Sequence, residues 1–417
     1  MTEYFDSLET RDPQAREDAL MMALSKHIEF AMRASPAMAE LLDGHDGHRI
    51  ASRKALSQLP VLRKSELLIH QKLRRKSTPF GGFCTVEPGP QMRRIFASPG
   101  PIYEPEGASA NYWRTARALH AAGFRSGDLI HNSFSYHLTP AGSFMEHGAH
   151  ALGCTVFPGG TGQTEQQAEA MAELQPNGYV GTPSFLRILL EKVDALALSV
   201  PSLRKALFSG EAFTPSQREW FGARGIAGYQ CYGTADVGLI AYETSYREGL
   251  VVDEEILLEI VQPGTKEPVE EGEVGEVVVT TFNRDYPLIR FATGDLSAVL
   301  PGACPSGRTN TRIKGWLGRA DQATKVRGMF VHPTQVQRLA ARLSELLYLR
   351  LVIRNPSGND EMILEAECDE AQRSSSLLLK TVETLRDITK LRGEVVLLDP
   401  GSLPRDGRTI VDVRSYE

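Results

Sequence analysis

The sequence predicts an α/β protein with two domains, a large multi-subdomain N-terminal domain and a small α+β lid domain. Two patterns carry this prediction. Short apolar runs alternate with amphipathic stretches from about residue 93, as in a mainly parallel sheet covered by helices. The order helix, hairpin, helix and strand fills roughly the last hundred residues. The length of 417 residues fits two to three domains at about 150 residues each.

The large domain is expected to begin with helices. Apolar residues recur at helical spacing over 12–42, another helical stretch follows Arg49, and residues 78–82 (Thr-Pro-Phe-Gly-Gly) break the pattern. Strands and helices then alternate. We expect strands over 128–134, 155–157, 178–180 and 205–208, and helices over 145–152, 164–174, 185–195 and 215–224. Gly or Pro soon after most strands predicts loops at the carboxyl edge of the sheet, where ligands usually bind.

The second half of the sequence predicts an antiparallel β subdomain and the lid. Strand patterns dominate 256–300, most clearly over 276–281. A boundary near Gly318 assigns 1–318 to the large domain and 319–417 to the lid. Within the lid we expect helices over 334–346 and 374–391, strands over 348–354, 362–368 and 394–398, and a tight turn over 356–360.

Composition restricts the function classes. The 46 Lys and Arg against 52 Asp and Glu give a net charge of −6, which argues against a general nucleic-acid binder. Five cysteines without a Cys-x-x-Cys pair are typical of a reduced, intracellular protein. The sequence has no apolar run of about 18 residues and no signal-peptide pattern at its N-terminus. We therefore expect a cytoplasmic protein without a membrane partner.

Three segments combine glycine with charged residues beside apolar strands, and we expect them to be loop-like. They are 232–236 (Tyr-Gly-Thr-Ala-Asp), 291–296 (Phe-Ala-Thr-Gly-Asp-Leu) and 318–328 (Gly-Arg-Ala-Asp-Gln-Ala-Thr-Lys-Val-Arg-Gly). Each segment alone is more often an ordinary turn. Lys325 and Arg327 alone would more often form a solvated basic surface. The order and spacing of all three segments are far more specific.

This order resembles the adenylate-forming ligases, and within them the phenylacetate–CoA ligase-like family. The similarity includes residues 287–291 (Pro-Leu-Ile-Arg-Phe) before Thr-Gly-Asp and 331–333 (Val-His-Pro) after the third segment, and it spans about residues 55 to 417. The resemblance implies that ATP and a small aromatic or similar carboxylic acid form an acyl-adenylate and pyrophosphate. The thiol of CoA then displaces AMP. The implied ligands are ATP or AMP, Mg²⁺, CoA and the acid.

The resemblance also assigns nucleotide-binding roles. Residues 209–213 are similar to the loop that borders the adenine, and Tyr232 of the Tyr232-Gly233 pair would stack on the base. Asp295 matches the carboxylate that accepts hydrogen bonds from both ribose hydroxyls, and Arg319 matches a second ribose contact. The adenine-loop residues carried over are Gly210, Glu211 and Ala212.

Metal and acid binding are assigned in the same way. Asp236 stands where the family has the Glu that holds Mg²⁺, and it keeps the charge on a side chain one methylene shorter. Ala235 stands where the family usually has Thr. Phe134 and Tyr136 fall in a stretch similar to the aromatic segment at the acyl pocket, whereas His137 is expected to be an ordinary polar residue.

The lid carries the remaining assignments. Asp321 matches the hinge about which the lid rotates. Lys325, Arg327 and Gly328 match the segment that faces the active site during thiol transfer. Arg408 occupies the position of the family's C-terminal Lys, which stabilises the adenylation transition state. Arg and Lys are not interchangeable at such a position, although Arg408 or Arg405 would supply the charge.

A second departure concerns the phosphate loop. The family has a Ser/Thr/Gly-rich run with a Lys, whereas residues 96–107 contain three prolines together with Glu104 and Glu106. Proline removes backbone donors and carboxylates repel triphosphate, so we expect a stiff segment rather than a mobile cradle. Three readings stay open: an acyl–CoA ligase, a nucleotide- or acyl-CoA-binding regulatory protein, and an enzyme that acylates a protein thiol. A homodimer is expected because relatives of this kind often form one.

Overall fold

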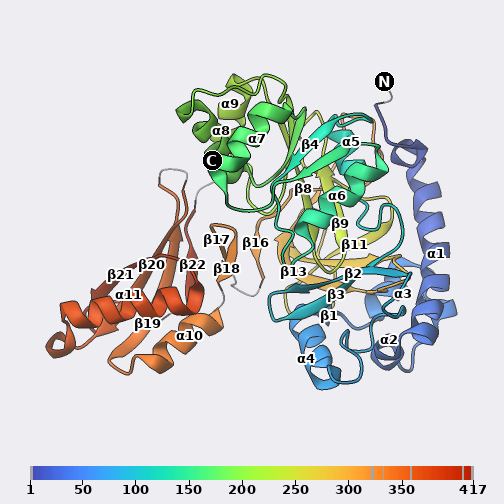
Figure 1. Ribbon diagram of the computed structural model, residues 1–417. Coiled ribbons are helices and arrows are strands. Elements are labelled where there is room, and N and C mark those ends of the chain that lie inside the picture. The colour runs from blue at the N-terminus through green and yellow to red at the C-terminus, as the bar shows by residue number, and fades with distance from the viewer. Residues whose placement is uncertain (1–2, 321–323, 332, 357–358, 406–407, 415–417) are drawn as a thin grey trace. The chain divides into compact units, whose positions relative to one another are not determined.

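The computed structural model describes residues 3–320, 324–331, 333–356, 359–405 and 408–414 (Figure 1). The chain forms two compact units, Met1–Leu317 and Gly318–Glu417. Within the described ranges, no helix is both long enough and apolar enough to cross a membrane.

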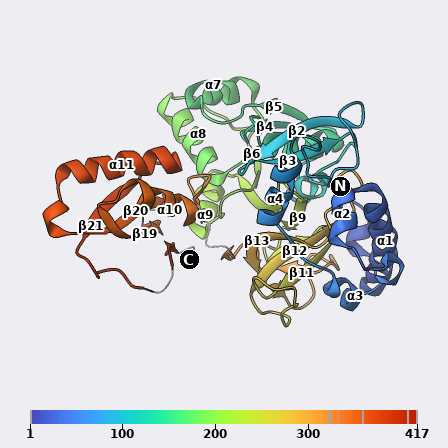
Figure 2. The same ribbon diagram turned by 90° about the horizontal axis from the view of Figure 1, so that it is seen from below.

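The N-terminal unit begins with helices, as the sequence predicts. The first long helix starts at Pro13 because Asp12 accepts a hydrogen bond from the Ala15 N–H (2.9 Å) and because proline suits the first helical position. Figure 2 shows α1, α2 and α3 gathered on one side of this unit. The helices are α1 (Pro13–Ala34), α2 (Pro36–Leu41), α3 (Arg53–Gln58) and α4 (Lys64–Arg74).

A nine-stranded sheet forms the centre of this unit, in the order β14-β15-β10-β9-β8-β7-β6-β4-β5. The pairs β5–β4, β4–β6, β6–β7 and β7–β8 are parallel, and the remaining pairs are antiparallel. The predicted alternation is therefore confirmed over its parallel half. The strands are β4 (Leu129–Asn132), β5 (Thr155–Pro158), β6 (Gly178–Gly181), β7 (Lys205–Phe208), β8 (Ala227–Thr234), β9 (Gly238–Glu243), β10 (Leu250–Val252), β14 (Val299–Leu300) and β15 (Arg312–Ile313). The helices between them are α5 (Ala116–Ala121), α6 (Ala141–Ala151), α7 (Thr164–Leu174), α8 (Pro183–Ala195) and α9 (Pro215–Ala223).

The second sheet contains the predicted antiparallel subdomain. Its strands are β1 (Leu62–Arg63), β11 (Ile256–Val261), β12 (Gly275–Thr281) and β13 (Phe291–Ser297), in the order β1-β13-β12-β11. The expectation of a loop over 291–296 is wrong, because this segment is β13. The pairs Glu276–Leu296 and Val278–Ala292 leave three residues of β13, 293–295, opposite one residue of β12. This bulge gives the Thr-Gly-Asp motif a local geometry that differs from the regular strand.

Residues 96–107, which the sequence predicts to be stiff, lie in a β-hairpin. It consists of β2 (Met92–Ser98) and β3 (Ile102–Gly107). Glu104 and Glu106 on β3 are both fully buried. Glu106 accepts hydrogen bonds from Trp113 Nε1 (2.9 Å), Arg94 Nη1 (2.7 Å) and the Ser143 hydroxyl. The expectation that Glu106 repels triphosphate is therefore wrong, because these buried donors compensate its negative charge.

Acid is expected to weaken this part of the fold. Burial alone would raise the pKa of Glu106, but hydrogen bonds from His147, Ser143, Trp113 and Arg94 outweigh burial and lower that pKa to about 2. A depressed carboxyl pKa stabilises the fold above the ordinary value near 4.5, and this stabilisation is lost as pH falls toward about 2. The stability advantage of wild type over Glu106→Gln should shrink by about 2 kcal/mol between pH 5 and pH 3. Urea unfolding at both pH values measures this difference, and a constant difference would contradict the assignment.

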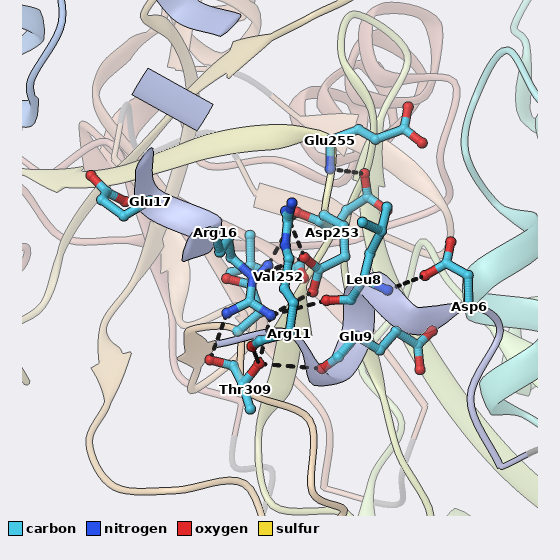
Figure 3. Close-up of polar contacts among 12 residues, drawn as sticks. Asp6, Leu8, Glu9, Arg11, Arg16, Glu17, Val252, Asp253, Glu255 and Thr309 are labelled. Carbon is cyan, nitrogen blue, oxygen red and sulfur yellow. Dashed lines mark hydrogen bonds and ion pairs between the residues drawn. The ribbon is translucent and has the colours of Figure 1, made fainter. Parts of the chain in front are cut away.

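Buried ion pairs fasten the N-terminal segment to distant parts of the unit (Figure 3). Arg16 Nε lies 2.8 Å from Glu254 Oε2, and Arg16 Nη2 donates to Thr309 Oγ1 at 2.7 Å. Arg117 contacts Asp6 (2.8 Å) and Glu9 (3.0 Å) in the same region. Residues near the start of the chain are thus part of the core.

The C-terminal unit is an α+β fold with the sheet order β21-β20-β19-β22. Helices α10 and α11 pack on each other and on this sheet. The helix expected over 334–346 ends at Arg342, and β19 begins at Leu346. The elements are β16 (Gly318–Arg319), β17 (Thr324–Val326), β18 (Met329–Val331), α10 (Pro333–Arg342), β19 (Leu346–Arg354), β20 (Glu361–Cys368), α11 (Ser375–Thr389), β21 (Glu394–Leu398) and β22 (Ile410–Asp412).

Candidate active site

The carboxyl ends of β4, β6, β7 and β8 lie at one edge of the nine-stranded sheet, because these strands are parallel neighbours. Three of the predicted site segments follow these strands directly. Phe134 and Tyr136 come after β4, residues 210–212 come after β7, and the segment 232–236 spans the end of β8 and the turn behind it. The topology therefore brings these segments to the edge where open α/β sheets usually bind ligands.

Asp295 is the centre of a buried hydrogen-bonded group. Tyr232 Oη donates to Asp295 Oδ2 (2.8 Å), and Trp316 Nε1 donates to Asp295 Oδ1 (3.1 Å). The Tyr232 hydroxyl also lies 3.1 Å from Thr293 Oγ1, which in turn accepts from the Asp295 N–H. The bulge in β13 thus places the Thr-Gly-Asp carboxylate beside the Tyr-Gly segment of β8. Two segments that the sequence selected independently meet at this point.

Asp236 forms an ion pair with a lysine that the sequence analysis missed. Lys64 Nζ, at the start of α4, donates to Asp236 Oδ2 at 2.7 Å. Asp236 Oδ1 is buried and has no hydrogen-bond partner within the described ranges. Glu104 lies in the same cluster: burial, followed by the charge of Asp236, raises its pKa to about 8, although Lys64 and Ser98 oppose this change. This environment favours the protonated form of Glu104.

One buried carboxylate oxygen suits a hard divalent cation. Mg²⁺ is commonly held by one or two carboxylates together with substrate phosphates, and Asp236 Oδ1 fits that requirement. Over the residues that the structure describes, no group of three or more His, Cys, Asp or Glu forms a metal cage.

Local packing fixes the shape of the loops at this edge. Gly210 has a φ of +82°, which favours glycine, and Ser184 Oγ donates to Glu211 Oε2 at 2.6 Å. Ala212 and Ala235 are partly exposed. A side chain at Gly233 would place a Cβ 2.7 Å from the Gly238 carbonyl oxygen, so this position on β8 has to be small.

The two predicted pocket residues differ in their surroundings. Phe134 is partly buried and packs on the hydrophobic core around Trp113 and Phe144. Tyr136 accepts a hydrogen bond from Asn132 Nδ2 (2.8 Å) and donates one to Glu146 Oε2 (2.7 Å). Burial and this carboxylate raise the pKa of Tyr136 above its ordinary value. Tyr136 is therefore a fixed polar residue.

The predicted lid residues all belong to the C-terminal unit, and Asp321 lies outside the described residues. Arg319 ends β16, Lys325 is the central residue of β17, and Gly328 is exposed with a φ of +81°. Arg327 donates from its backbone N–H to Asp360 Oδ2 (2.9 Å) and from Nη1 to the Arg392 carbonyl (3.1 Å).

The two candidate arginines for the C-terminal cation are both exposed. Arg405 Nη2 lies 2.7 Å from Glu367 Oε2, and its guanidinium lies 4.0 Å from the Tyr348 ring centre. Arg408 is exposed, two residues before β22. Arg405 is exposed as well, so the assignment of the cation to Arg408 rests on its position in the sequence.

Comparisons with known proteins extend this picture. The family model "AMP-binding enzyme" matches residues 110–283. The chain is 30% identical to a phenylacetate–coenzyme A ligase of Thermus thermophilus, over 94% of this chain and 95% of that protein. This chain belongs to the phenylacetate–CoA ligase-like family of adenylate-forming enzymes. Phenylacetate–coenzyme A ligases of Escherichia coli (30% identity, 84% of each chain) and Aromatoleum evansii (28%, 85% and 80%) are further relatives.

Solved structures support the fold of this family member. A 2-hydroxyisobutyryl–CoA ligase bound to its acyl-adenylate and CoA superposes with a TM-score of 0.85 at 23% identity, and the match covers 100% of this chain and 93% of the other. The same ligase in a postadenylation state gives 0.73. The expected adenylate-forming fold is therefore confirmed.

Proposed function

We propose that this protein is an AMP-forming acyl–CoA ligase that acts on an aromatic or similar small carboxylic acid. The similarity to the Thermus ligase over 94% of the chain carries this proposal. In the first half-reaction, the carboxylate of the acid attacks the α-phosphorus of ATP, and pyrophosphate leaves. In the second, the CoA thiolate attacks the acyl carbon, AMP leaves, and the thiol proton passes to solvent. Cytoplasmic location and a homodimer stay predictions.

Each half-reaction requires charge in defined places. Asp295 would accept hydrogen bonds from the ribose hydroxyls. Asp236 would hold Mg²⁺, which neutralises polyphosphate charge when bound. Lys64 is a further cation beside Asp236, and it supports the proposal because the phosphate-loop lysine of the family is missing here. Arg408 would meet the carboxylate and α-phosphate in the adenylation transition state. Arg319, Lys325, Arg327 and Gly328 would act from the lid.

The decisive experiment is ATP–pyrophosphate exchange across a panel of aryl and short-chain acids. Exchange with at least one acid, followed by CoA-dependent release of AMP, is the expected result. Tight AMP binding without exchange for any acid would instead favour the regulatory binding protein. Exchange without CoA-dependent release would favour a protein thiol as the acceptor.

Replacing Asp295 with alanine should weaken AMP binding by roughly tenfold or more, about 1.4 kcal/mol. The physical reason is the loss of a carboxylate that suits a cis-diol. Trp316→Phe is the matched control, because it removes one donor to Asp295 and keeps the carboxylate. Calorimetric titration with AMP measures both variants. Wild-type affinity in Asp295→Ala would contradict the ribose assignment.

A further inference from the structure

A cavity beside the β2–β3 hairpin is lined by two arginines and two histidines that have no part in the reaction proposed above. Its volume is about 320 Å³, at the lower end of the range for small-molecule sites. It is lined by Arg93, Arg94, Ala110, Glu146, His147 and His150. Strand β2 supplies both arginines, and helix α6 supplies the glutamate and both histidines.

A β-bulge is the reason why two consecutive arginines line one cavity. In a regular strand, neighbouring side chains point to opposite faces. Here Met92 pairs with Gly107 and Arg94 pairs with Glu106, so Arg93 is an extra residue without a counterpart on β3. Bulges of this kind redirect side chains and are frequent next to functional sites.

Buried Glu106 holds two of the lining side chains in place. Its Oε1 atom lies 2.7 Å from Arg94 Nη1 and 3.2 Å from His147 Nε2. Arg94 also donates to Ser143 Oγ at 3.0 Å. His147 is 4% exposed, and its Nδ1 atom is buried without a hydrogen-bond partner in the described part of the chain. Glu106 thus preorganises the arginine and the histidine that it contacts in the cavity wall.

We propose that this cavity binds a phosphate group. Guanidinium groups offer forked donors that match phosphate oxygens, and Arg93 and Arg94 present two of them side by side. The one lining carboxylate, Glu146, accepts the Tyr136 hydroxyl (2.7 Å) and has Arg94 Nη2 at 4.0 Å. Its charge is therefore partly compensated. Inorganic phosphate and the phosphate monoester of a nucleotide share this chemistry, and the inference does not depend on ligase activity.

The test is calorimetric titration of the full-length protein with inorganic phosphate and, separately, with adenosine 3′,5′-bisphosphate. Saturable binding of at least one ligand is expected, and the ligand that binds identifies the source of the phosphate. Arg93→Ala should weaken this binding by about tenfold, as expected for the loss of one charge-assisted contact. Arg93→Glu should abolish it. Arg33→Ala, a change at an exposed arginine on α1, should leave it unchanged.

Asp295→Ala separates this cavity from the nucleotide site. Phosphate binding that survives Asp295→Ala and is lost in Arg93→Glu supports the proposal, even if no acid gives pyrophosphate exchange. The proposal is overturned if neither ligand binds at millimolar concentration. It is equally overturned if binding is lost in Asp295→Ala and kept in Arg93→Glu, because the phosphate would then occupy the nucleotide site.

Discussion

Replacing Arg408 with alanine is expected to slow acyl-adenylate formation by about 100- to 1000-fold, equivalent to about 2.7–4 kcal/mol of lost transition-state stabilisation. The reason is the removal of the proposed cation from a pentacoordinate phosphorus that gains negative charge. Thioester formation from a preformed acyl-adenylate should stay within about threefold of wild type, because phosphorus stays four-coordinate in that step and forms no pentacoordinate transition state. Rapid-quench measurement of both half-reactions checks the expectation.

Two further variants sharpen this experiment. Arg408→Lys keeps the charge and restores the residue found at this position in the family, so it should recover most of the adenylation rate. Arg386→Ala removes an exposed arginine from α11 of the same unit and should affect neither half-reaction. Equal losses in both half-reactions for Arg408→Ala would refute the assigned role.

Arg290→Met is expected to destabilise the N-terminal unit by about 3–5 kcal/mol. Arg290 is fully buried, and its Nε and Nη2 atoms each lie 3.0 Å from the Glu259 carboxylate. It also donates to the carbonyls of Ser57 (2.8 Å) and Leu59 (2.6 Å). Methionine would fill much of the volume but leave a buried carboxylate without its counter-charge. Urea unfolding followed by circular dichroism measures the loss.

A double variant separates charge from packing. Arg290→Met combined with Glu259→Leu removes both charges, and replacing a buried ion pair by apolar residues is often nearly neutral. The double variant should therefore be more stable than Arg290→Met alone. If both variants unfold at the same urea concentration, the stability would come from the carbonyl contacts of Arg290 rather than from its ion pair.

The sequence predicts well the helices and strands that have a periodic apolar pattern and turn residues at both ends. The bounds of α7, β7 and β21 agree with the periodic patterns, since turn residues flank each of them. The helix α10 was extended too far, because the apolar spacing continues through Leu343 and Leu346 without a glycine or proline to mark the end. The three-residue strand β22 is too short to show a period.

The sequence predicts which segments form the candidate site, but it does not predict the contacts between them. Lys64 and Asp236 are 172 residues apart, and no local sequence pattern predicts their ion pair. Trp316 lies outside every motif, yet it donates to Asp295. The carboxylates of the hairpin were misjudged for the same reason: Glu104 and Glu106 look exposed in the sequence, and only the tertiary fold shows that they are buried.

The ion pairs that fasten the N-terminal segment also bear on how the chain folds during synthesis. The contacts of Arg16 with Glu254 and Thr309 span 238 and 293 residues. Ribosomes that add roughly 5–20 residues per second need on the order of 15–60 s to reach residue 309. Until then the start of α1 carries charges whose partners have not been made. The contacts of Arg16 are therefore completed only after almost the whole N-terminal unit has been synthesised.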